Sequence, residues 1–226
     1  MAYPDFNTII AHFPDFSKHK FASLPPQKRQ RIIEAAMNEF RKGYSGAVTD
    51  TITENADISK GLLFHYFASK KKLFTFLIKL AGRFMVSEYE RAAIDSRDFL
   101  ENLWEVSKTS IKLSLTHREL YDFVTKAYFS FSTVFPEGQP EDLRNPSLEM
   151  LMNIYSRSDN SFFKEDIDAE KAKNIILWTI NGFSEQITQY GNTIENYIPY
   201  YDQILKDLEE YLRVLRKCFY KQQFEM

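Results

Sequence analysis

The sequence has 226 residues, of which 44% are hydrophobic and 27% are charged. This composition is typical of a folded globular protein and excludes disordered and collagen-like chains. Gly and Pro, at 7 and 8 residues, are too scarce for a turn-rich β-sandwich. The net charge of −2 hides an asymmetry, because residues 18–83 carry a net charge of +8 and residues 84–226 a net charge of −8. We therefore expect a basic module and an acidic module with different tasks.

The chain offers little for redox or metal chemistry. Its one cysteine, Cys218, excludes an internal disulfide and is expected to be a small apolar filler. His12, His19 and His117 lack Cys, His or acidic residues at metal-ligand spacing, so we expect no metal and no cofactor. No apolar run reaches the roughly 18–20 residues of a membrane span, and residues 1–24 do not resemble a signal peptide. The sequence predicts a cytoplasmic protein without a membrane partner.

Apolar residues recur at the spacing of a helical face throughout the N-terminal part. The first such segment is short and amphipathic, and Pro14 ends it. Two short segments separated by a turn at Asp57 then precede a long one. In chain order the predicted helices are 5–13, 27–42, 49–56, 59–66 and 70–89. Short helices joined by a turn of about three residues are typical of a helix-turn-helix.

Capping residues support these boundaries. Pro26 suits the first turn of its helix, and Gly43 is the expected C-cap of the same helix. The hydroxyls of Thr49, Ser59 and Ser69 are the predicted N-caps of the three helices that follow.

Helical spacing continues to the C-terminus, interrupted by a loop-like stretch at 136–146. The predicted helices are 99–115, 120–131, 147–155, 168–190 and 200–220. Without strand-like alternation, the predicted fold class is all-α. Apolar residues in 200–220 step by four and three, as in a heptad seam, and the broad stripe needs two partners, one of which could be a second subunit. The alternative is an ordinary core helix. The predicted dimer-interface residues are Trp178, Tyr201, Leu205, Leu208, Leu212 and Leu215.

Basic and aromatic residues are interleaved in the predicted 59–66 helix. A helix of this length fits the major groove of DNA, where its N-terminal residues reach base edges. Lys60 can donate to a guanine or a phosphate, Gly61 permits close approach of the helix, and Leu62 can contact a thymine methyl group. His65 and Tyr66 would donate to phosphate oxygens at the end of the helix.

Lys70 and Lys71 begin the next predicted helix, where free N–H groups and the helix dipole also favour phosphate. The alternative for these lysines is a solvated face, and His65 could be an ordinary surface residue. Leu63 and Phe67 are expected to anchor the 59–66 helix to the 27–42 helix.

This part of the chain resembles the DNA-binding domain of the TetR family of transcriptional repressors. The resemblance covers about residues 27–80 and is specific in both spacing and residue type. The matching residues are Ile33, Ala36, Phe40, Gly43-Tyr44, Ile52, Ala56, the run from Ile58 to Phe67, and Ser69-Lys70-Lys71.

The resemblance implies a homodimeric repressor that binds a palindromic operator in double-stranded DNA and is released by a small-molecule effector. Phe64 stands where the family usually has a Tyr that touches a phosphate, so Phe64 is expected at the DNA without that hydrogen bond. Asp57 stands at a usual Gly, and Asp tolerates a left-handed conformation well. Val48 occupies a place often filled by Ser or Thr, which leaves Thr49 as the expected phosphate donor. Ser59 completes the predicted DNA-binding set.

The expected domains are an N-terminal extension (1–24) without an assigned role, a helix-turn-helix domain (25–86, motif about 49–68) and an effector-binding and dimerisation domain (87–226). Ligand sites in helical proteins are mostly apolar, so aromatic residues are candidates for an effector pocket that takes a lipophilic molecule. These candidates are Trp104, Phe123, Tyr128, Phe131, Tyr155, Trp178 and Phe183.

Two alternatives to a regulator stay open at this point. A helical ligand carrier or adaptor could retain a helix-turn-helix as a protein-binding element, and DNA binding would distinguish it. An all-α enzyme is the other, but the chain has no Gly-rich phosphate loop, nucleophile elbow or zinc-binding helix motif. We therefore predict that it is not an enzyme.

Overall fold

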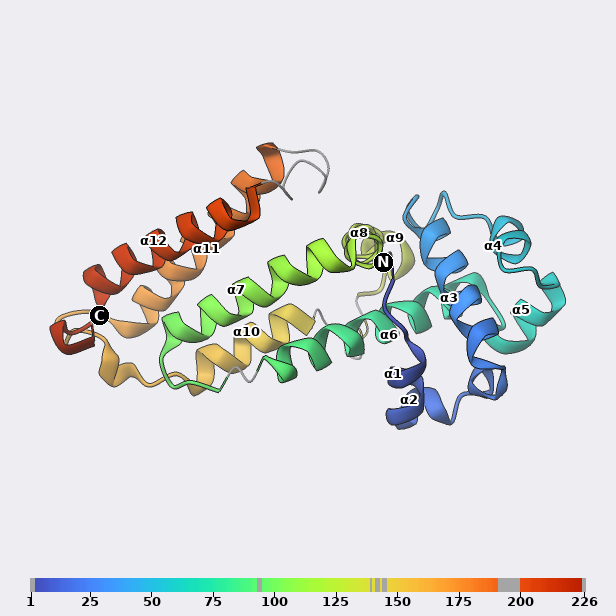
Figure 1. Ribbon diagram of the computed structural model, residues 1–226, viewed down its shortest axis with the longest axis horizontal. Coiled ribbons are helices and arrows are strands. Elements are labelled where there is room, and N and C mark those ends of the chain that lie inside the picture. The colour runs from blue at the N-terminus through green and yellow to red at the C-terminus, as the bar shows by residue number, and fades with distance from the viewer. Residues whose placement is uncertain are drawn as a thin grey trace. The chain divides into compact units, whose positions relative to one another are not determined.

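The computed structural model describes residues 3–92, 95–138, 140, 143, 146–190 and 200–224, with the side chains of 146–149, 185 and 187–190 left aside. Its regular elements are helices, which confirms the all-α prediction (Figure 1). The α-helices are α1 (Asn7–His12), α2 (Pro14–Ser17), α3 (Pro26–Phe40), α4 (Thr49–Asn55), α5 (Lys60–Phe67), α6 (Lys70–Arg91), α7 (Phe99–Thr116), α8 (Arg118–Phe129), α9 (Phe131–Val134), α10 (Pro146–Arg157), α11 (Ala169–Tyr190) and α12 (Tyr201–Phe219). Short 3₁₀ helices are η1 (Lys20–Ser23), η3 (Asn160–Phe162) and η6 (Gln222–Phe224).

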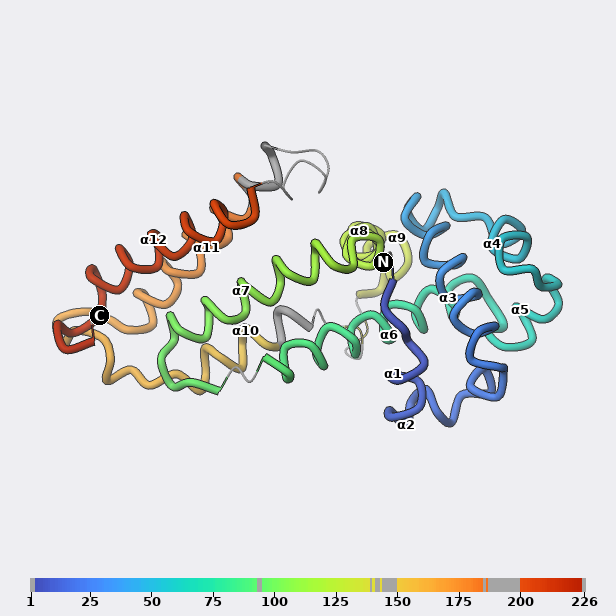
Figure 2. The backbone as a smooth tube through the Cα atoms, viewed as in Figure 1, coloured from blue at the N-terminus to red at the C-terminus, as the bar shows by residue number. Residues whose placement is uncertain are grey.

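Packing divides the chain into two compact units. The first unit is Met1–Glu88 with Thr116–Leu148, and the second is Tyr89–Leu115 with Glu149–Met226. Figure 2 traces the backbone through both. Helices α8 and α9 therefore belong with the N-terminal helices, and the functional division at residues 25–86 and 87–226 stays a prediction.

The core of the first unit is built on α3 and α6. The apolar stripe of α3 is fully buried at Ile32, Ile33, Ala36, Met37 and Phe40, as its helical spacing predicts. The predicted stripe of α6 is buried as well, at Leu73, Phe74, Leu77, Leu80 and Phe84. Each fully buried residue of this size contributes about 1.5–3 kcal/mol relative to exposure.

Helix α8 packs against α3. Arg41 Nε donates to Asp122 Oδ2 at 2.7 Å. The predicted single helix 120–131 is in fact two, α8 and α9, because the chain breaks at Ser130. The hydroxyl of Ser130 donates to the Lys126 carbonyl at 2.9 Å and accepts the backbone N–H of Tyr44 at 3.2 Å. This side chain therefore bonds the backbone both of its own helix and of the loop after α3.

The N-terminal segment before α3 is an ordered part of the first unit. We call residues 3–24, which contain α1, α2 and η1, the arm. Phe6, Phe16 and Phe21 of the arm are at most 2% exposed. The predicted helix at 5–13 is shorter than expected, since α1 ends at His12 and Pro14 begins α2. The arm runs beside α3 and α6 (Figure 1).

The second unit is built from α7, α10, α11 and α12. Its core gathers Phe99, Leu100, Leu103, Ile154, Phe163, Ala172, Ile176, Leu208, Leu212, Leu215 and Tyr220. Asp98, before α7, accepts hydrogen bonds from Tyr220 Oη at 2.8 Å and from Arg216 Nη1 at 2.6 Å. These bonds tie the start of α7 to the end of α12.

Among the described residues, no helix is both long enough and apolar enough to cross a membrane. Groups of three or more His, Cys, Asp or Glu side chains that could hold a metal ion are likewise absent from the described part of the chain.

Candidate nucleic-acid interface

The turn between α4 and α5 has the conformation that the sequence suggests. Asp57 has a φ of 51°, which confirms that this residue adopts the left-handed conformation in the turn. The Ile58 N–H donates to the Thr53 carbonyl at 3.0 Å. From α3, Arg31 Nε donates to the Ala56 carbonyl at 3.0 Å. The turn is thus fixed both by its own backbone and by a side chain of the supporting helix.

The start of α4 is held by a residue that the sequence analysis missed. The predicted N-cap, Thr49, is wrong, because Val48 occupies that position and provides no side-chain hydrogen bond. Instead Glu39 of α3 accepts the Val48 N–H at Oε1, 3.0 Å away. Its Oε2 accepts from Lys42 Nζ at 2.7 Å. The carboxylate therefore caps a helix that lies elsewhere in the sequence. In the sequence, the signal for this role was the position of Glu39, a charged residue directly beside the apolar stripe of α3.

Glu39 is 3% exposed, so its charge must be compensated. Burial alone would raise the pKa of the Glu39 carboxyl. The hydrogen bonds from Lys42 and Val48, with the positive charges of Lys42 and Lys70, outweigh burial and lower this pKa below its usual value of 4.5. Glu39 is thus an ionised anchor between α3 and α4.

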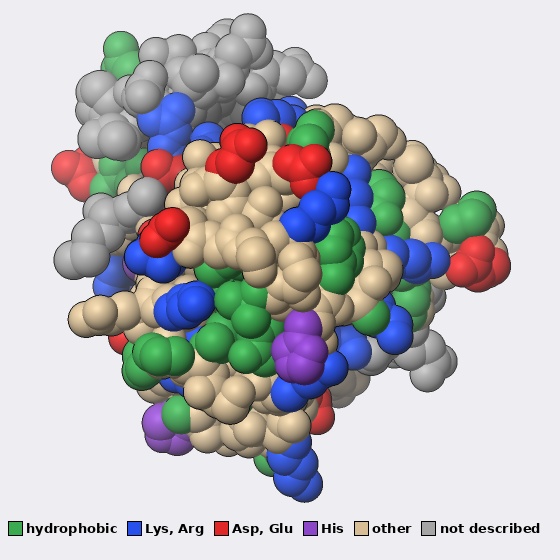
Figure 3. All heavy atoms as spheres, turned by 90° about the vertical axis from the view of Figure 1, so that its right-hand side faces the viewer, with side chains coloured by type: hydrophobic (Ala, Val, Ile, Leu, Met, Phe, Trp, Pro, Cys, Tyr) green, Lys and Arg blue, Asp and Glu red, His purple; other side chains and the backbone are tan. Residues whose placement is uncertain are grey.

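The residues of α5 that are predicted to bind DNA are all exposed or half-buried. Ser59 is the N-cap, as predicted, and its Oγ accepts the Leu62 N–H at 3.1 Å. Leu63 and Phe67 are buried, which leaves the opposite side of the helix accessible. Lys60, Gly61 and His65 are exposed, and Leu62, Phe64 and Tyr66 are half-buried. In Figure 3, which faces the side of the first unit that carries α4 and α5, Lys and Arg side chains surround exposed apolar ones.

Gly61 has no internal reason to be a glycine. Apart from its chain neighbours and the backbone of its own helix, the described atom that a Cβ at this position would meet within 4 Å is Ser59 Oγ, at 4.0 Å, which is an ordinary contact. A glycine inside a helix costs roughly 0.5–1 kcal/mol relative to alanine. An approaching surface outside the chain is a physical reason to keep this position bare.

The lysines that are predicted to contact DNA differ in how free their ammonium groups are to do so. Lys60 Nζ lies 2.6 Å from Asp50 Oδ1, but both side chains are more than half exposed, so a phosphate can compete with this weak pair. Lys70 Nζ donates to the Ala47 carbonyl at 2.6 Å and lies over the Tyr44 ring. Burial lowers the pKa of Lys70 despite the nearby Glu39. The Lys70 ammonium is therefore directed into the protein.

The start of α6 offers other groups. Lys71 Nζ lies 3.6 Å from Glu137 Oε1 and over the Phe135 ring, so it too has partners within the unit. Ser69 caps the helix as predicted, accepting the Lys72 N–H at 3.1 Å.

At the end of α3, Gly43 has a φ of 84° but follows the actual C-cap, Arg41, by two residues. The predicted cap was therefore misplaced.

The predicted effector-pocket residues are divided between the two units. Phe123, Tyr128 and Phe131 lie in the first unit, and Trp104, Tyr155, Trp178 and Phe183 lie in the second. The second unit has an open groove of about 540 Å³ between α11 and α12. The groove is lined by Phe183, Gln186, Ile204, Asp207, Glu210, Tyr211 and Val214. Only Phe183 belongs to both sets.

The predicted dimer-interface residues also fall into two groups. Leu208, Leu212 and Leu215 are buried in the core of their own unit, and Tyr201 and Leu205 are half-buried. Trp178 is 70% exposed. Other exposed apolar side chains of the same helices are Ile175, Tyr211 and Val214. Cys218 is exposed, so its interpretation as an apolar filler was wrong.

Comparison with known proteins finds similarity to bacterial transcriptional regulators with a helix-turn-helix. The family model for "Bacterial regulatory proteins, tetR family" matches residues 32–75, which span α3 to α6. The biofilm operon icaADBC HTH-type negative transcriptional regulator IcaR of Staphylococcus aureus is 23% identical over 206 residues, covering 82% of this chain and 99% of IcaR. The HTH-type transcriptional repressor AcnR of Corynebacterium efficiens is 33% identical over 95 residues, covering 41% of this chain and 50% of AcnR.

Solved structures share the fold. A TetR family transcriptional regulator from Chloroflexus aurantiacus has a TM-score of 0.64 at 18% identity, covering 89% of this chain and 97% of that one. The TetR family regulator PfmR of Thermus thermophilus has a TM-score of 0.53 at 24% identity, covering 78% of this chain and 97% of PfmR.

Proposed function

Since the chain belongs to the TetR family of DNA-binding transcriptional regulators, which are not enzymes, we propose that it is a homodimeric repressor released from its operator by a small lipophilic ligand. IcaR is named as a negative regulator and AcnR as a repressor, which supports repression as the direction of control. A repressor of this kind acts in the cytoplasm, where its operator DNA lies.

The exposed side of α5 carries the proposal for the DNA contact. Gly61 leaves the helix bare where no internal contact needs it, and Lys60 stands beside it with only a weak surface partner. We assign the base edges to Lys60, Gly61 and Leu62, which lie in the first turn. We assign the phosphate contacts to Thr49, Ser59, His65 and Tyr66. Phe64 would pack against the sugar-phosphate backbone of the DNA.

Lys70 and Lys71 have a different place in this proposal. Their ammonium groups have partners inside the first unit, so the N-terminal end of α6 approaches phosphate mainly through its backbone N–H groups. Substitution of Lys70 would therefore lower stability as well as DNA affinity.

DNA binding is tested by letting the protein enrich a duplex from a random-sequence pool and measuring fluorescence anisotropy on the enriched duplex. Affinity should fall steeply with salt, because each phosphate contact releases counterions. Lys60→Ala should weaken binding by about 1–3 kcal/mol if Lys60 reads a base, and lower the salt slope by about 1 if it contacts a phosphate. Lys126→Ala, an exposed lysine on α8, is the matched control and should change neither. Failure to enrich any duplex across a range of salt would favour an adaptor.

Dimerisation is proposed through α11 and α12, which pack side by side. Trp178 and Ile175 are exposed one turn apart on α11, and Tyr211 and Val214 are exposed at the same spacing on α12. Four apolar side chains on two adjacent helices form a patch of the kind that marks interfaces. A twofold axis would cover this patch on both copies.

Sedimentation tests the dimer. The wild type should sediment as a dimer at micromolar concentration, and Trp178→Asp should sediment as a monomer. Met152→Asp alters a similarly exposed apolar residue on α10 and should stay dimeric. A monomeric wild type would refute the homodimer.

The effector is proposed to bind in the second unit. The groove between α11 and α12 has a volume of the size that small ligands occupy, about 300–1,000 Å³. Because Tyr211 and Val214 line this groove and also belong to the proposed dimer patch, the effector would bind beside the partner copy. For release, the effector must bind the DNA-incompetent arrangement more tightly than the competent one. Screening lipophilic compounds for loss of anisotropy on the enriched duplex tests this, and Phe183→Ala should weaken the response if the groove is the site.

A further inference from the structure

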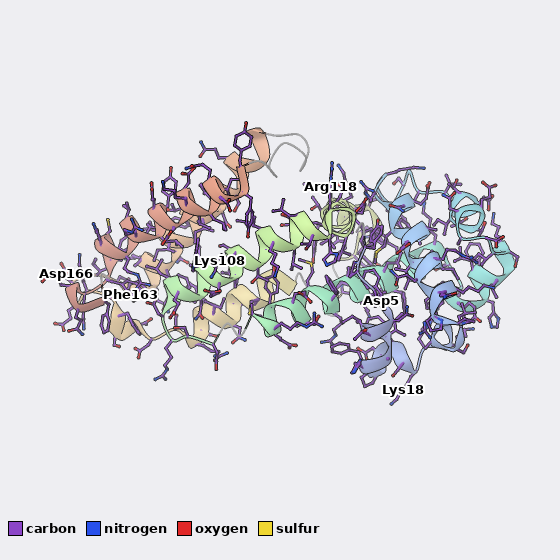
Figure 4. All side chains as sticks on the ribbon, in the orientation of Figure 1. Asp5, Lys18, Lys108, Arg118, Phe163 and Asp166 are labelled. Atoms are coloured by element: carbon purple, nitrogen blue, oxygen red, sulfur yellow. The ribbon has the colours of Figure 1, made fainter. Side chains whose placement is uncertain are left out.

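The arm is fastened to α3 at both ends. Near its start, Gln30 Nε2 donates to the Pro4 carbonyl at 2.8 Å, and Gln30 Oε1 accepts the Phe6 N–H at 3.1 Å. Near its end, Arg29 donates to the carbonyls of Leu24, at 3.0 Å, and of Ala22. Figure 4 labels two residues of the arm, Asp5 and Lys18. The intervening residues are therefore held in a defined place.

Between these attachments, the arm packs against the C-terminal end of α5. The Phe21 ring lies 4.9 Å from the Phe67 ring and meets the Tyr66 ring edge to face at 5.8 Å and 77°. The His19 ring stacks on Phe67 at 5.7 Å. Phe76 of α6 completes the cluster, 5.6 Å from Phe21. Phe21 is fully buried, so its ring has no freedom to leave this position.

Helix α5 needs such support because it is short. A helix of eight residues is marginal by itself, and its position depends on tertiary contacts. Its C-cap, Ala68, has a φ of 58°, which a non-glycine residue adopts only when its surroundings enforce it. Tyr66 lies two residues before this cap, and its ring is in edge-to-face contact with both the His65 ring and the Phe21 ring.

We propose that Phe21 is a positioning residue for DNA binding, which fixes the Tyr66 side chain and the C-terminal end of α5 through aromatic contact. The arm would then contribute to DNA binding by holding α5 of the helix-turn-helix in place. The inference rests on the proposed DNA contact of Tyr66 and adds the residue through which the arm controls it.

The test uses the enriched duplex as the probe and compares Phe21→Leu, Tyr66→Phe and the double variant in the full-length protein. Leu keeps an apolar side chain in the site but removes the ring edge that faces Tyr66. An edge-to-face contact of this kind corresponds to about a two- to tenfold change in affinity. Phe21→Leu should weaken binding by that factor and leave the salt slope unchanged, because the neutral Tyr66 hydroxyl releases no counterion. The double variant should bind no more weakly than Tyr66→Phe alone.

Phe6→Leu is the matched control. Phe6 is an equally buried arm residue, but its ring contacts Phe84 of α6, at 6.1 Å, and not α5. It should lower thermal stability to a similar degree and leave DNA affinity and salt slope unchanged below its melting temperature. If Phe21→Leu fails to fold, Phe21→Met replaces it, since a thioether retains part of the contact with aromatic rings.

Two results would overturn the inference alone. One is Phe21→Leu binding the duplex like Phe6→Leu, and the other is the Phe21 and Tyr66 effects multiplying in the double variant, which would mean that the two residues act independently. A wild type that enriches no duplex would instead refute the proposed function and this inference with it.

Discussion

Glu39 gives the most direct test of how α3 positions the helix-turn-helix. Replacing it by Gln keeps the shape and leaves one oxygen to accept the Val48 N–H. The amide cannot provide the charge that Lys42 Nζ meets at 2.7 Å. In Glu39→Ala both hydrogen bonds are lost, and the Val48 N–H has no side-chain acceptor at the start of α4.

The magnitude follows from the two contacts. A hydrogen bond to a charged group contributes about 1.5–3 kcal/mol, so Glu39→Gln should lower the free energy of unfolding of the first unit by about 2 kcal/mol. The Val48 N–H loses a second hydrogen bond to the same charged group, worth a further 1.5–3 kcal/mol or so, which brings Glu39→Ala to about 4 kcal/mol. For a urea m-value of about 2 kcal/mol/M, the Gln variant should unfold at a midpoint roughly 1 M lower.

Urea unfolding followed by circular dichroism measures this, with Glu34→Gln, a half-buried carboxylate on the same helix, as the control. The folded pKa of Glu39 is lowered, so its stabilisation is complete above about pH 4.5 and is lost as pH falls through the folded pKa. The gap between wild type and Glu39→Gln should therefore close in acid. Equal midpoints for Glu39→Gln and Glu34→Gln at neutral pH would refute the anchoring role.

Three further changes probe other features. Asp57→Gly should alter stability by only a few tenths of a kcal/mol, whereas Asp57→Val should cost about 1–2 kcal/mol because φ is 51°; equal melting temperatures would contradict a strained turn. Burial, with Lys20 nearby, lowers the pKa of His19, so the unfolded chain takes up its proton first and stability should fall as pH drops from about 6.5 through the folded pKa. His19→Phe should flatten that part of the profile, and an unchanged profile would exclude His19 as its source. Asp98→Asn leaves Arg216 without its carboxylate and should cost about 2–4 kcal/mol in urea unfolding, against about 0–1 kcal/mol for Asp95→Asn in an exposed pair.

The fold class and most of the helix-turn-helix could be predicted from the sequence because their determinants are local. The stripe of α3 appears as apolar residues three and four apart, and Ser59 caps α5 through a bond to a residue three positions away. Asp57 is similar, since its left-handed conformation depends on its own side chain and the turn around it.

Errors arose where a distant residue decides local structure. The N-cap of α4 was assigned to Thr49, but Glu39 of another helix provides the hydrogen bond. The break at Ser130 depends partly on the Tyr44 N–H, which is 86 positions away in the sequence. For the seam of α12 two partners were expected, one of which could be a second subunit. The structure buries Leu208, Leu212 and Leu215 in the core of the chain's own unit, and the second partner stays a prediction.

The sequence by itself determined that the chain is helical and predicted residues 59–66 as the DNA-binding helix, because helical periodicity, capping and residue type are read over a few positions. Only the tertiary structure decided which of those side chains are available. It directs Lys70 into the protein, leaves Gly61 bare, and seats Phe21 of the arm against Tyr66. These are contacts between residues far apart in the chain, and they exist only after the helices have packed.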